Sequence, residues 1–314
     1  MMPIPVILDC DPGQDDAIML MIAGANRARL NILGITTVAG NVPLCKTSRN
    51  ARVICQMTGN TDIGVYAGCA QPLKRALLTA ADVHGREGIN GIDIFEPDMA
   101  LQDEHAVDFI IRTLRAHTDN PVTLVITGPS TNVASALLKD PEIKSSIGQI
   151  VLMGGARTAA GNVTPSAEFN MFVDPDAAAV IYGSGVPVVT IGLDVTHKVL
   201  ALPERLCRIQ KIGGKIAEAV ANVLGPYSFY DENQFGLAGA PIHDPCTVAY
   251  VLAPKLFRTR AVNIQVETKS ELTLGHTAVD YWQRTDRTPN TLWADDVDVD
   301  GVFAILYQAL ESYA

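Results

Sequence analysis

Short apolar runs alternate with stretches of helical pattern along the first two thirds of the chain. The apolar runs are residues 6–8, 32–38, 63–66, 122–126, 150–153 and 186–191. Each is apolar at successive positions rather than at every second one, which is typical of strands buried on both faces. Helical patterns lie between them at about residues 16–25, 44–57, 104–116, 131–138 and 174–182. This alternation predicts an α/β fold with a mostly parallel open sheet and helices on both faces.

The pattern changes after about Val195. We expect two or three helices up to Val251, strands at residues 262–266 and 278–282, and a closing helix from Val302. No repeat, low-complexity tract or linker sets this part apart. We therefore interpret residues 1–314 as a single domain with extra helices and a small C-terminal strand elaboration.

The composition is that of a globular protein and argues against nucleic-acid and membrane partners. The chain has 314 residues, of which 48% are hydrophobic and 18% charged, as in ordinary globular proteins. A formal net charge of −10 without a cluster of Lys or Arg argues against a nucleic-acid partner. Six cysteines without a C-x-x-C pair indicate reduced thiols. No basic signal-peptide start and no apolar stretch of roughly 20 residues is found, so we expect a cytoplasmic protein without a membrane partner.

Four aspartates, Asp9, Asp11, Asp15 and Asp16, fall at the junction of the first strand and the first helix. They repel one another, and the nearest basic residue is Arg27. A bound divalent cation is the leading explanation, and ligands that are all oxygen favour Ca²⁺ or Mg²⁺ over zinc. The ordinary alternative is that such residues cap the helix and bond the turn, and we expect at least one of them to do so.

Ligands of open α/β sheets bind beyond the carboxyl ends of the strands. The residues that follow the predicted strands there include Gly, Asn, Thr and Asp, at 39–41, 127–130, 154–155 and 192–194. This chemistry suits a polar ligand held by backbone and amide groups. The sequence therefore predicts a metal-assisted site for a small polar molecule.

Three further stretches are candidates for the same site. His243-Asp244-Pro245 is by itself a common turn or helix start, but it can bring Asp244 to the first cluster and let His243 donate a proton to a leaving group. Residues 161–170 carry two amides and an acid that can bind sugar hydroxyls, although Asn and Gly also fill loops for conformational reasons. His84 lies in a glycine-bounded loop, where a lone histidine is more often an exposed bystander.

Together these motifs have a recognisable order. They are Asp9-Cys10-Asp11-Pro12-Gly13-x-Asp15-Asp16, Ala39-Gly40-Asn41, Val83-His84-Gly85, Met153-Gly154-Gly155, Glu168-Phe169-Asn170 and His243-Asp244-Pro245. The set resembles the inosine–uridine nucleoside hydrolase family from residue 4 to about residue 250, with weaker similarity to the C-terminus. Residues 194–198 and 241–247 are most similar to the pyrimidine-preferring ribonucleoside hydrolases of bacteria.

The resemblance implies hydrolysis of the N-glycosidic bond of ribonucleosides, uridine and cytidine above all, in a homodimer or homotetramer. A Ca²⁺ ion would bind the carboxylates of Asp11, Asp16 and Asp244 and the backbone carbonyl of Thr127. Asp15 would be the general base, and Asp9 would support the metal loop.

The resemblance also implies which residues contact the substrate. Those expected at the ribose are Asn41, Asn162, Glu168 and Asn170, with Met153 packing nearby. Those expected at the base are His84, Phe169 and His243. The chain departs from the family at Arg86 and Glu87, where an acid followed by a small residue is expected, and at Phe235, where some relatives have Tyr or Trp.

Two other functions fit part of the pattern. A strand ending in Asp9-x-Asp11 resembles Mg²⁺-dependent phosphohydrolases of the haloacid-dehalogenase type, but these have Thr or Val where this chain has Gly13, and they have no use for the second aspartate pair. A non-catalytic nucleoside- or sugar-binding module shares the ribose contacts. It gives no reason for Asp15 to be spare once the metal is satisfied.

Overall fold

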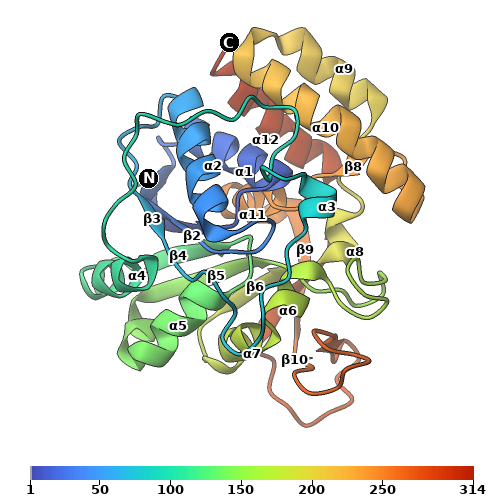
Figure 1. The fold of residues 1–314 in the computed structure, drawn as a ribbon. Helices are drawn as coiled ribbons and strands as arrows, with labels where there is room; N and C mark the ends of the chain where they lie inside the picture. The colour runs from blue at the N-terminus through green and yellow to red at the C-terminus, as the bar shows by residue number, and fades with distance from the viewer. Residues whose placement is uncertain (1) are drawn as a thin grey trace.

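The computed structural model describes residues 2–314, apart from the side chains of residues 81–82 and 226–235. An eight-stranded sheet forms the centre, in the order β3-β2-β1-β4-β5-β6-β12-β9 (Figure 1). Its strands are β1 (Ile4–Cys10), β2 (Leu30–Thr37), β3 (Val65–Ala67), β4 (Val122–Ile126), β5 (Ile147–Met153), β6 (Val188–Ile191), β12 (Thr291–Val297) and β9 (Phe257–Val262). All neighbours pair in parallel except β9, which is antiparallel to β12. The predicted mostly parallel open sheet is confirmed.

Helices cover both faces of the sheet (Figure 1). On one side lie α1 (Gln14–Ala25), α2 (Leu44–Met57), α9 (Pro203–Ile212), α10 (Gly214–Phe235), α11 (Pro245–Leu252) and α12 (Val299–Glu311). On the other lie α4 (Ala106–Arg115), α5 (Thr131–Lys139) and α7 (Pro175–Gly183). The short helices α3 (Ala81–His84), α6 (Phe169–Val173) and α8 (Leu193–Thr196) belong to connections.

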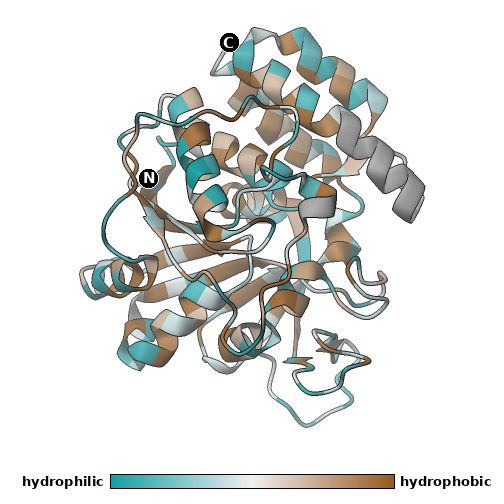
Figure 2. Ribbon diagram, in the orientation of Figure 1, coloured by the Kyte–Doolittle hydropathy of each residue, from teal (hydrophilic) through white to brown (hydrophobic). Residues whose placement is uncertain are grey.

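The two layers explain why the strands are apolar at every position. In β1, Val6 and Leu8 pack into the core under α1, whereas Ile7 packs into the core on the opposite face. Figure 2 shows the strands of the sheet mostly brown, while the helices carry brown and teal residues on different sides. Each helix thus buries an apolar stripe against a sheet that is apolar on both faces.

The C-terminal part differs from the prediction in detail. The strand expected at residues 262–266 is interrupted at Asn263, so that β9 stays in the main sheet while β10 (Ile264–Val266) pairs with β11 (Thr277–Val279) in a separate ribbon. β12 was not predicted, and the closing helix α12 begins three residues before Val302, where Asp298 caps it by accepting a bond from the Gly301 N–H at 3.0 Å.

The structure also shows the state of the cysteines and the character of the helices. All six cysteines lie in the described part and are free thiols. Among the helices described, none has the combination of length and apolar character that a bilayer crossing requires.

The strand order determines where the candidate site lies. From β1 the chain moves outward to β2 and β3, and it then returns to β4 on the other side of β1. The carboxyl end of β1 is therefore the point where the winding reverses, which is the usual ligand position in open α/β sheets. Two contacts bring the start of α11 to the same region. The strand β8 (Ala240–Pro241), which comes shortly before α11, pairs with β7 (Leu200–Ala201), and α11 itself packs against α1.

Candidate active site

Asp9 lies inside the protein at the end of β1. Its Oδ1 accepts hydrogen bonds from the Thr36 hydroxyl at 2.6 Å and from Asn132 Nδ2 at 2.8 Å, while Oδ2 has no hydrogen-bond partner. Complete burial outweighs these two bonds and raises the pKa of the Asp9 carboxyl to about 7. Asp9 thus joins the first strand to β2 and α5, in keeping with the supporting role expected for it.

Asp11 follows β1 and lies between two glycines. A Cβ on Gly40 would stand 2.1 Å from Asp11 Oδ2, and one on Gly128 would stand 2.6 Å from Oδ1. Only glycine therefore allows the carboxylate to occupy this position. Its Oδ2 accepts the Asn41 N–H at 2.6 Å, but its buried Oδ1 has no partner. Burial, followed by the charge of Asp16, raises the pKa of Asp11 well above its usual value.

Asp16 closes the first turn of α1. Its Oδ2 accepts the backbone N–H of Gly13, the N-cap residue, at 3.0 Å, and its Oδ1 accepts the Thr127 hydroxyl at 2.7 Å. The expectation that at least one aspartate serves the helix start is therefore confirmed. The bond to Thr127 also connects the first helix to the carboxyl end of β4.

Asp15, Asp16 and Asp244 form a buried group of three acids. Each offers a carboxylate oxygen, and these oxygens all lie within 4.8 Å of one another. Burial is the main cause that raises the pKa of each carboxyl, to about 7 for Asp15 and well above the usual value for Asp244, whose next cause is the charge of Asp15. Among the described residues, no Lys or Arg forms an ion pair with any of them.

These acids fit a hard divalent cation. The donors are all oxygen, they repel one another when ionised, and the unpartnered Oδ1 of Asp11 adds another acceptor beside Asp16. The group of three contains Asp15, which we expected to be the base, rather than Asp11, which we expected to be a ligand. The structure thus brings the sequence-predicted acids together without by itself dividing their roles.

The carbonyl of Thr127 lies beside Asn170. The Asn170 amide nitrogen donates to the Thr127 carbonyl at 2.7 Å and to the Met153 carbonyl at 3.3 Å, and it stands 3.7 Å from the Met153 sulfur. Asn170 and Met153 are both buried. The amide therefore joins the ends of β4 and β5, and it places two of the predicted substrate residues next to a predicted metal ligand.

Glu168 and Asn162 shape the segment before α6. Glu168 is the N-cap of this helix, with Oε1 accepting the Asn170 N–H at 2.9 Å and Oε2 accepting the Gly155 N–H at 2.9 Å. Burial raises the pKa of Glu168. Asn162 Oδ1 accepts the N–H of Phe169, which is half-buried, at 2.9 Å. The conformational alternative for this loop is thus partly correct, since both side chains bond to backbone.

His84 is buried, with 7% of its surface exposed, so the exposed-bystander alternative does not hold. Its Nδ1 contacts Oε1 of Gln14. A Cβ on Gly13 would stand 2.8 Å from His84 Nδ1 and 2.7 Å from Asn41 Nδ2. His84 therefore lies directly against the loop of aspartates.

His243 precedes Asp244 at the start of α11. Its Nδ1 lies 2.7 Å from the Thr196 hydroxyl oxygen, and its ring centre is 5.7 Å from that of His197. Burial, followed by the nearby imidazoles of His197 and His84, lowers the pKa of His243 well below its usual value. The ring is therefore neutral at pH 7. The side chain of Phe235 lies outside the described residues.

Several partners of the site were missed by the sequence analysis. Thr36 and Asn132 hold Asp9, Gln14 contacts His84, and Thr196 contacts His243. Gln14 lies within the aspartate motif and Thr196 within residues 194–198, so the motifs indicated that both residues are near the site. The motifs did not indicate which side chains the two residues contact. Nothing in the sequence indicated Thr36 and Asn132.

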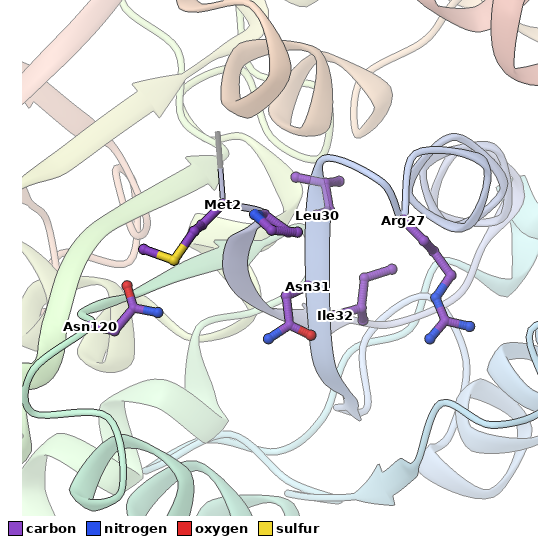
Figure 3. A pocket seen from close by; sticks show the side chains of 7 residues that line it. Met2, Arg27, Leu30, Asn31, Ile32 and Asn120 are labelled. Atoms are coloured by element: carbon purple, nitrogen blue, oxygen red, sulfur yellow. The ribbon is translucent and has the colours of Figure 1, made fainter.

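A hollow lies at the amino ends of the strands, at the end of the sheet opposite to the acidic group (Figure 3). It is found where β1 and β2 begin and just before β4, and it is lined by Met2, Pro3, Arg27, Leu30, Asn31, Ile32 and Asn120. No carboxylate lines it. Its position at the amino ends of the strands and its chemistry set it apart from the acidic site.

Comparison with known proteins agrees with this geometry. The family model described as inosine-uridine preferring nucleoside hydrolase matches residues 6–304. The pyrimidine-specific ribonucleoside hydrolase RihA of Shigella boydii serotype 4 is 44% identical over 314 residues, which is 100% of both chains. The purine-preferring ribonucleoside hydrolase from Gardnerella vaginalis has the same fold, with a TM-score of 0.90, 34% identity and coverage of 98% of both chains. A plant nucleoside hydrolase, PpNRh1, gives a TM-score of 0.91 and 29% identity over 98% of this chain and 99% of its own. The chain therefore belongs to the inosine-uridine preferring nucleoside hydrolase family.

Proposed function

We propose that the enzyme hydrolyses the N-glycosidic bond of pyrimidine ribonucleosides, uridine and cytidine, to ribose and the free base. The observation that carries the proposal is the group of buried acids at the end of β1, with the Asn41 N–H bonded to Asp11 and the Asn170 amide bonded to the Thr127 carbonyl beside them. A phosphohydrolase of the haloacid-dehalogenase type has no role for Asp244, which the fold delivers to this group from α11.

We assign the cation to Asp11, Asp16, Asp244 and the carbonyl of Thr127, and we propose that it is Ca²⁺. The unpartnered Oδ1 of Asp11 and the set of ligands that are all oxygen support this assignment. When bound, the ion supplies positive charge that polarises the attacking water and holds the ribose hydroxyls in place.

Asp15 acts as the general base in this proposal. We choose Asp15 because, unlike Asp16 and Asp11, it accepts neither the Gly13 N–H nor the Asn41 N–H. Its carboxylate instead accepts the backbone N–H groups of Asp15 and Asp16 and lies beside Asp244. Burial and the charge of Asp16 raise its pKa to about 7, which is the direction that makes a carboxylate a stronger base. The water oxygen bonds to the anomeric carbon as the bond from carbon to base nitrogen breaks, and the water proton passes to Asp15. The bonding pair stays on the base nitrogen, which takes a proton from solvent water to give the free base. Attack from the face opposite the base inverts the anomeric carbon.

His243 assists the departure of the base. Because its pKa is lowered, the ring is neutral at pH 7 and carries no stored proton for the leaving group. We assign to it a hydrogen bond to the base, with the orientation of the ring fixed by the Thr196 hydroxyl at Nδ1. His84 and Phe169 complete the base side of the site in this proposal.

The preference for pyrimidines rests on the relatives. The relative that is 44% identical along its whole length is named as pyrimidine-specific, whereas the 34% identical structural neighbour is named as purine-preferring. Higher identity favours the first. The side chains of residues 226–235 lie outside the described residues. The preference between pyrimidine and purine bases is therefore tested by the assay below.

One assay separates the functions considered. The protein is incubated with uridine, cytidine, inosine, adenosine and p-nitrophenyl phosphate, with and without a chelator, and released reducing sugar and phosphate are measured. We expect ribose from uridine and cytidine, and its loss with chelator. Phosphate release without ribose would overturn the proposal, as would nucleoside binding without turnover, and faster hydrolysis of inosine would overturn the pyrimidine preference.

A further inference from the structure

The turn that follows His84 is fastened to helix α2. Lys46, Arg49 and Asn50 occupy one face of this helix, at spacings of three and four residues. The Glu87 carboxylate pairs with Lys46 Nζ at 3.0 Å and with Arg49 at 2.6 Å. Glu87 is one of the positions where the chain departs from the family pattern, and the structure shows what it contacts there.

Asn50 makes the inner part of this fastening. Its side chain is completely buried, and its amide nitrogen donates to two carbonyls, that of Pro12 at 3.1 Å and that of Glu87 at 2.7 Å. An amide nitrogen has two hydrogens, so each carbonyl receives one. Pro12 lies between Asp11 and Gly13 in the aspartate loop. A single side chain therefore joins the aspartate loop to the turn after His84.

The backbone of the turn is built for this close approach. Gly88 has a φ of +88°, and a Cβ there would stand 2.9 Å from Asn50 Nδ2 and 2.8 Å from Val42. Its N–H donates to the Gly85 carbonyl at 3.1 Å, which closes the turn. Any residue other than glycine at position 88 would push the turn away from α2.

Of the two fastenings, the buried one is the stronger. The Glu87 carboxylate side chain is 48% exposed, and ion pairs in such surroundings contribute little to stability. Loss of Asn50 would leave the buried Pro12 carbonyl and the Glu87 carbonyl without these partners, which is more costly. The position of the turn thus depends chiefly on Asn50.

We propose that Asn50 is a positioning residue that holds His84 against the aspartate loop. The ion pairs of Glu87 with Lys46 and Arg49 make a weaker, second contribution to the position of the turn. This inference rests on the proposed function, because it assumes that His84 contacts the nucleoside. The aspartate loop keeps its bonds from the Asn41 N–H to Asp11 and from the Gly13 N–H to Asp16, which do not involve Asn50. Loss of Asn50 therefore loosens substrate binding more than it moves Asp15 and the metal ligands. KM then changes more than kcat.

The test uses Asn50→Leu, which is similar in size and removes both donor hydrogens without adding charge. Asn60→Leu is the matched control. Asn60 is also buried, it follows the same helix, and its amide nitrogen donates to Thr58, remote from the aspartates. The full chain with Ca²⁺ is compared by steady-state kinetics with uridine, by calorimetry with Ca²⁺, and by hydrogen–deuterium exchange of the His84 and Gly88 amides.

For Asn50→Leu we expect KM to rise by about tenfold or more, the equivalent of one lost buried hydrogen bond, with kcat and Ca²⁺ affinity within about threefold. The two amides should exchange faster than in the wild type. Asn60→Leu should leave all of these unchanged, even if its melting temperature falls equally. The inference is overturned if KM stays constant in Asn50→Leu, or if Asn60→Leu raises it as much.

Glu87→Gln provides a second test if Asn50→Leu does not fold. It removes only the ion pairs of a half-exposed side chain, and Asp62→Asn, which breaks the remote pair with Arg27, is its control. Faster exchange at Gly88 in Glu87→Gln alone supports the inference, and equal exchange in both contradicts it. If the wild type releases no ribose from any nucleoside, the proposed function fails, whereas the exchange measurements still decide whether α2 holds the turn.

Discussion

Asp15 and Asp16 are neighbours in the chain but have different surroundings. Both oxygens of Asp16 accept hydrogen bonds, from the Gly13 N–H and the Thr127 hydroxyl. Asp15 lies close to Asp244, and burial together with the charge of Asp16 raises its pKa to about 7. At the scale of single residues, the site therefore separates the two neighbouring acids by their hydrogen-bond partners, while burial raises the pKa of both.

This separation predicts the effect of Asp15→Asn. The variant keeps the size of the side chain but removes the base, so kcat with uridine should fall by about 10²- to 10⁴-fold. Ca²⁺ affinity, measured by calorimetry, should change little. Asp11→Asn is the counterpart and should lose Ca²⁺ affinity. A variant at Asp15 that binds no Ca²⁺ would show that Asp15 is a ligand, and one with a kcat near that of the wild type would show that it is not the base.

Asp9 predicts a pH dependence of stability. Its folded pKa of about 7 lies above the ordinary value of 3.8, so the folded state binds a proton that the unfolded state releases. This contribution to stability is fully present below pH 3.8 and is lost as the pH rises through about 7. In chelator, the free energy of unfolding of the wild type should therefore fall relative to Asp9→Asn between pH 5 and pH 8. At about 1.4 kcal/mol per pKa unit, the change is roughly 2.5 kcal/mol. Denaturant titrations of the two proteins at both pH values measure it, and parallel curves would contradict it.

At the scale of elements, β12 decides how the C-terminal part joins the sheet. It lies between β6 and β9, and Trp293 is completely buried beside Gly192, where an added Cβ would stand 2.5 Å from the indole ring. Gly192 directly follows β6 and is the N-cap of α8. The tryptophan thus packs against the residue that precedes α8, the helix that ends at Thr196, whose hydroxyl contacts His243.

The packing predicts a large effect of Trp293→Ala. Removing a fully buried tryptophan should lower the free energy of unfolding by about 3–5 kcal/mol, measured by denaturant titration. Trp282→Ala is the matched control, because 71% of the surface of Trp282 is exposed, and it should change stability by less than about 0.5 kcal/mol. Similar losses in the two variants would mean that β12 does not occupy the core position.

The sequence predicted the elements whose pattern is local. Strands such as β4 and β5 are apolar on both faces and are recognisable from their own residues. β12 is not, because its apolar run of Leu292 to Ala294 is followed at once by two aspartates. Its strand character comes from pairing with β6 and β9, which are distant in the chain.

The same limit applies to the site. The motifs identified the acids and amides, because their residue types and spacing carry the chemistry. Partners such as Asn132, which holds Asp9, and Asn50, which joins two loops, are ordinary helix residues in the sequence. Only the three-dimensional fold shows that they contact the site.

At the scale of the whole molecule, the acidic group joins distant parts of the chain. Asp15 and Asp16 belong to the first helix, and Asp244 comes from the start of α11. A cation that binds all of them stabilises the folded state alone, since the unfolded chain does not bring them together.

Removal of the metal should therefore lower the melting temperature. At a Ca²⁺ concentration of about 100 times Kd, binding contributes about 2.7 kcal/mol, which is several degrees for a chain of this size. Scanning calorimetry with Ca²⁺ and with chelator measures the shift. Asp244→Asn should lose most of it, and an equal melting temperature in all three samples would contradict a metal at this position.

The position of Asp244 late in the sequence has a consequence for incomplete chains. A ribosome has already made Asp11, Asp15 and Asp16 when most of the protein is still absent, and Asp244 is added only at the start of α11. With Asp244 as the ligand we propose, a fragment that stops before α11 keeps the repulsion among the first three acids and lacks a ligand of the ion. Retention of Ca²⁺ should then distinguish full-length chains from truncated ones before any substrate is added.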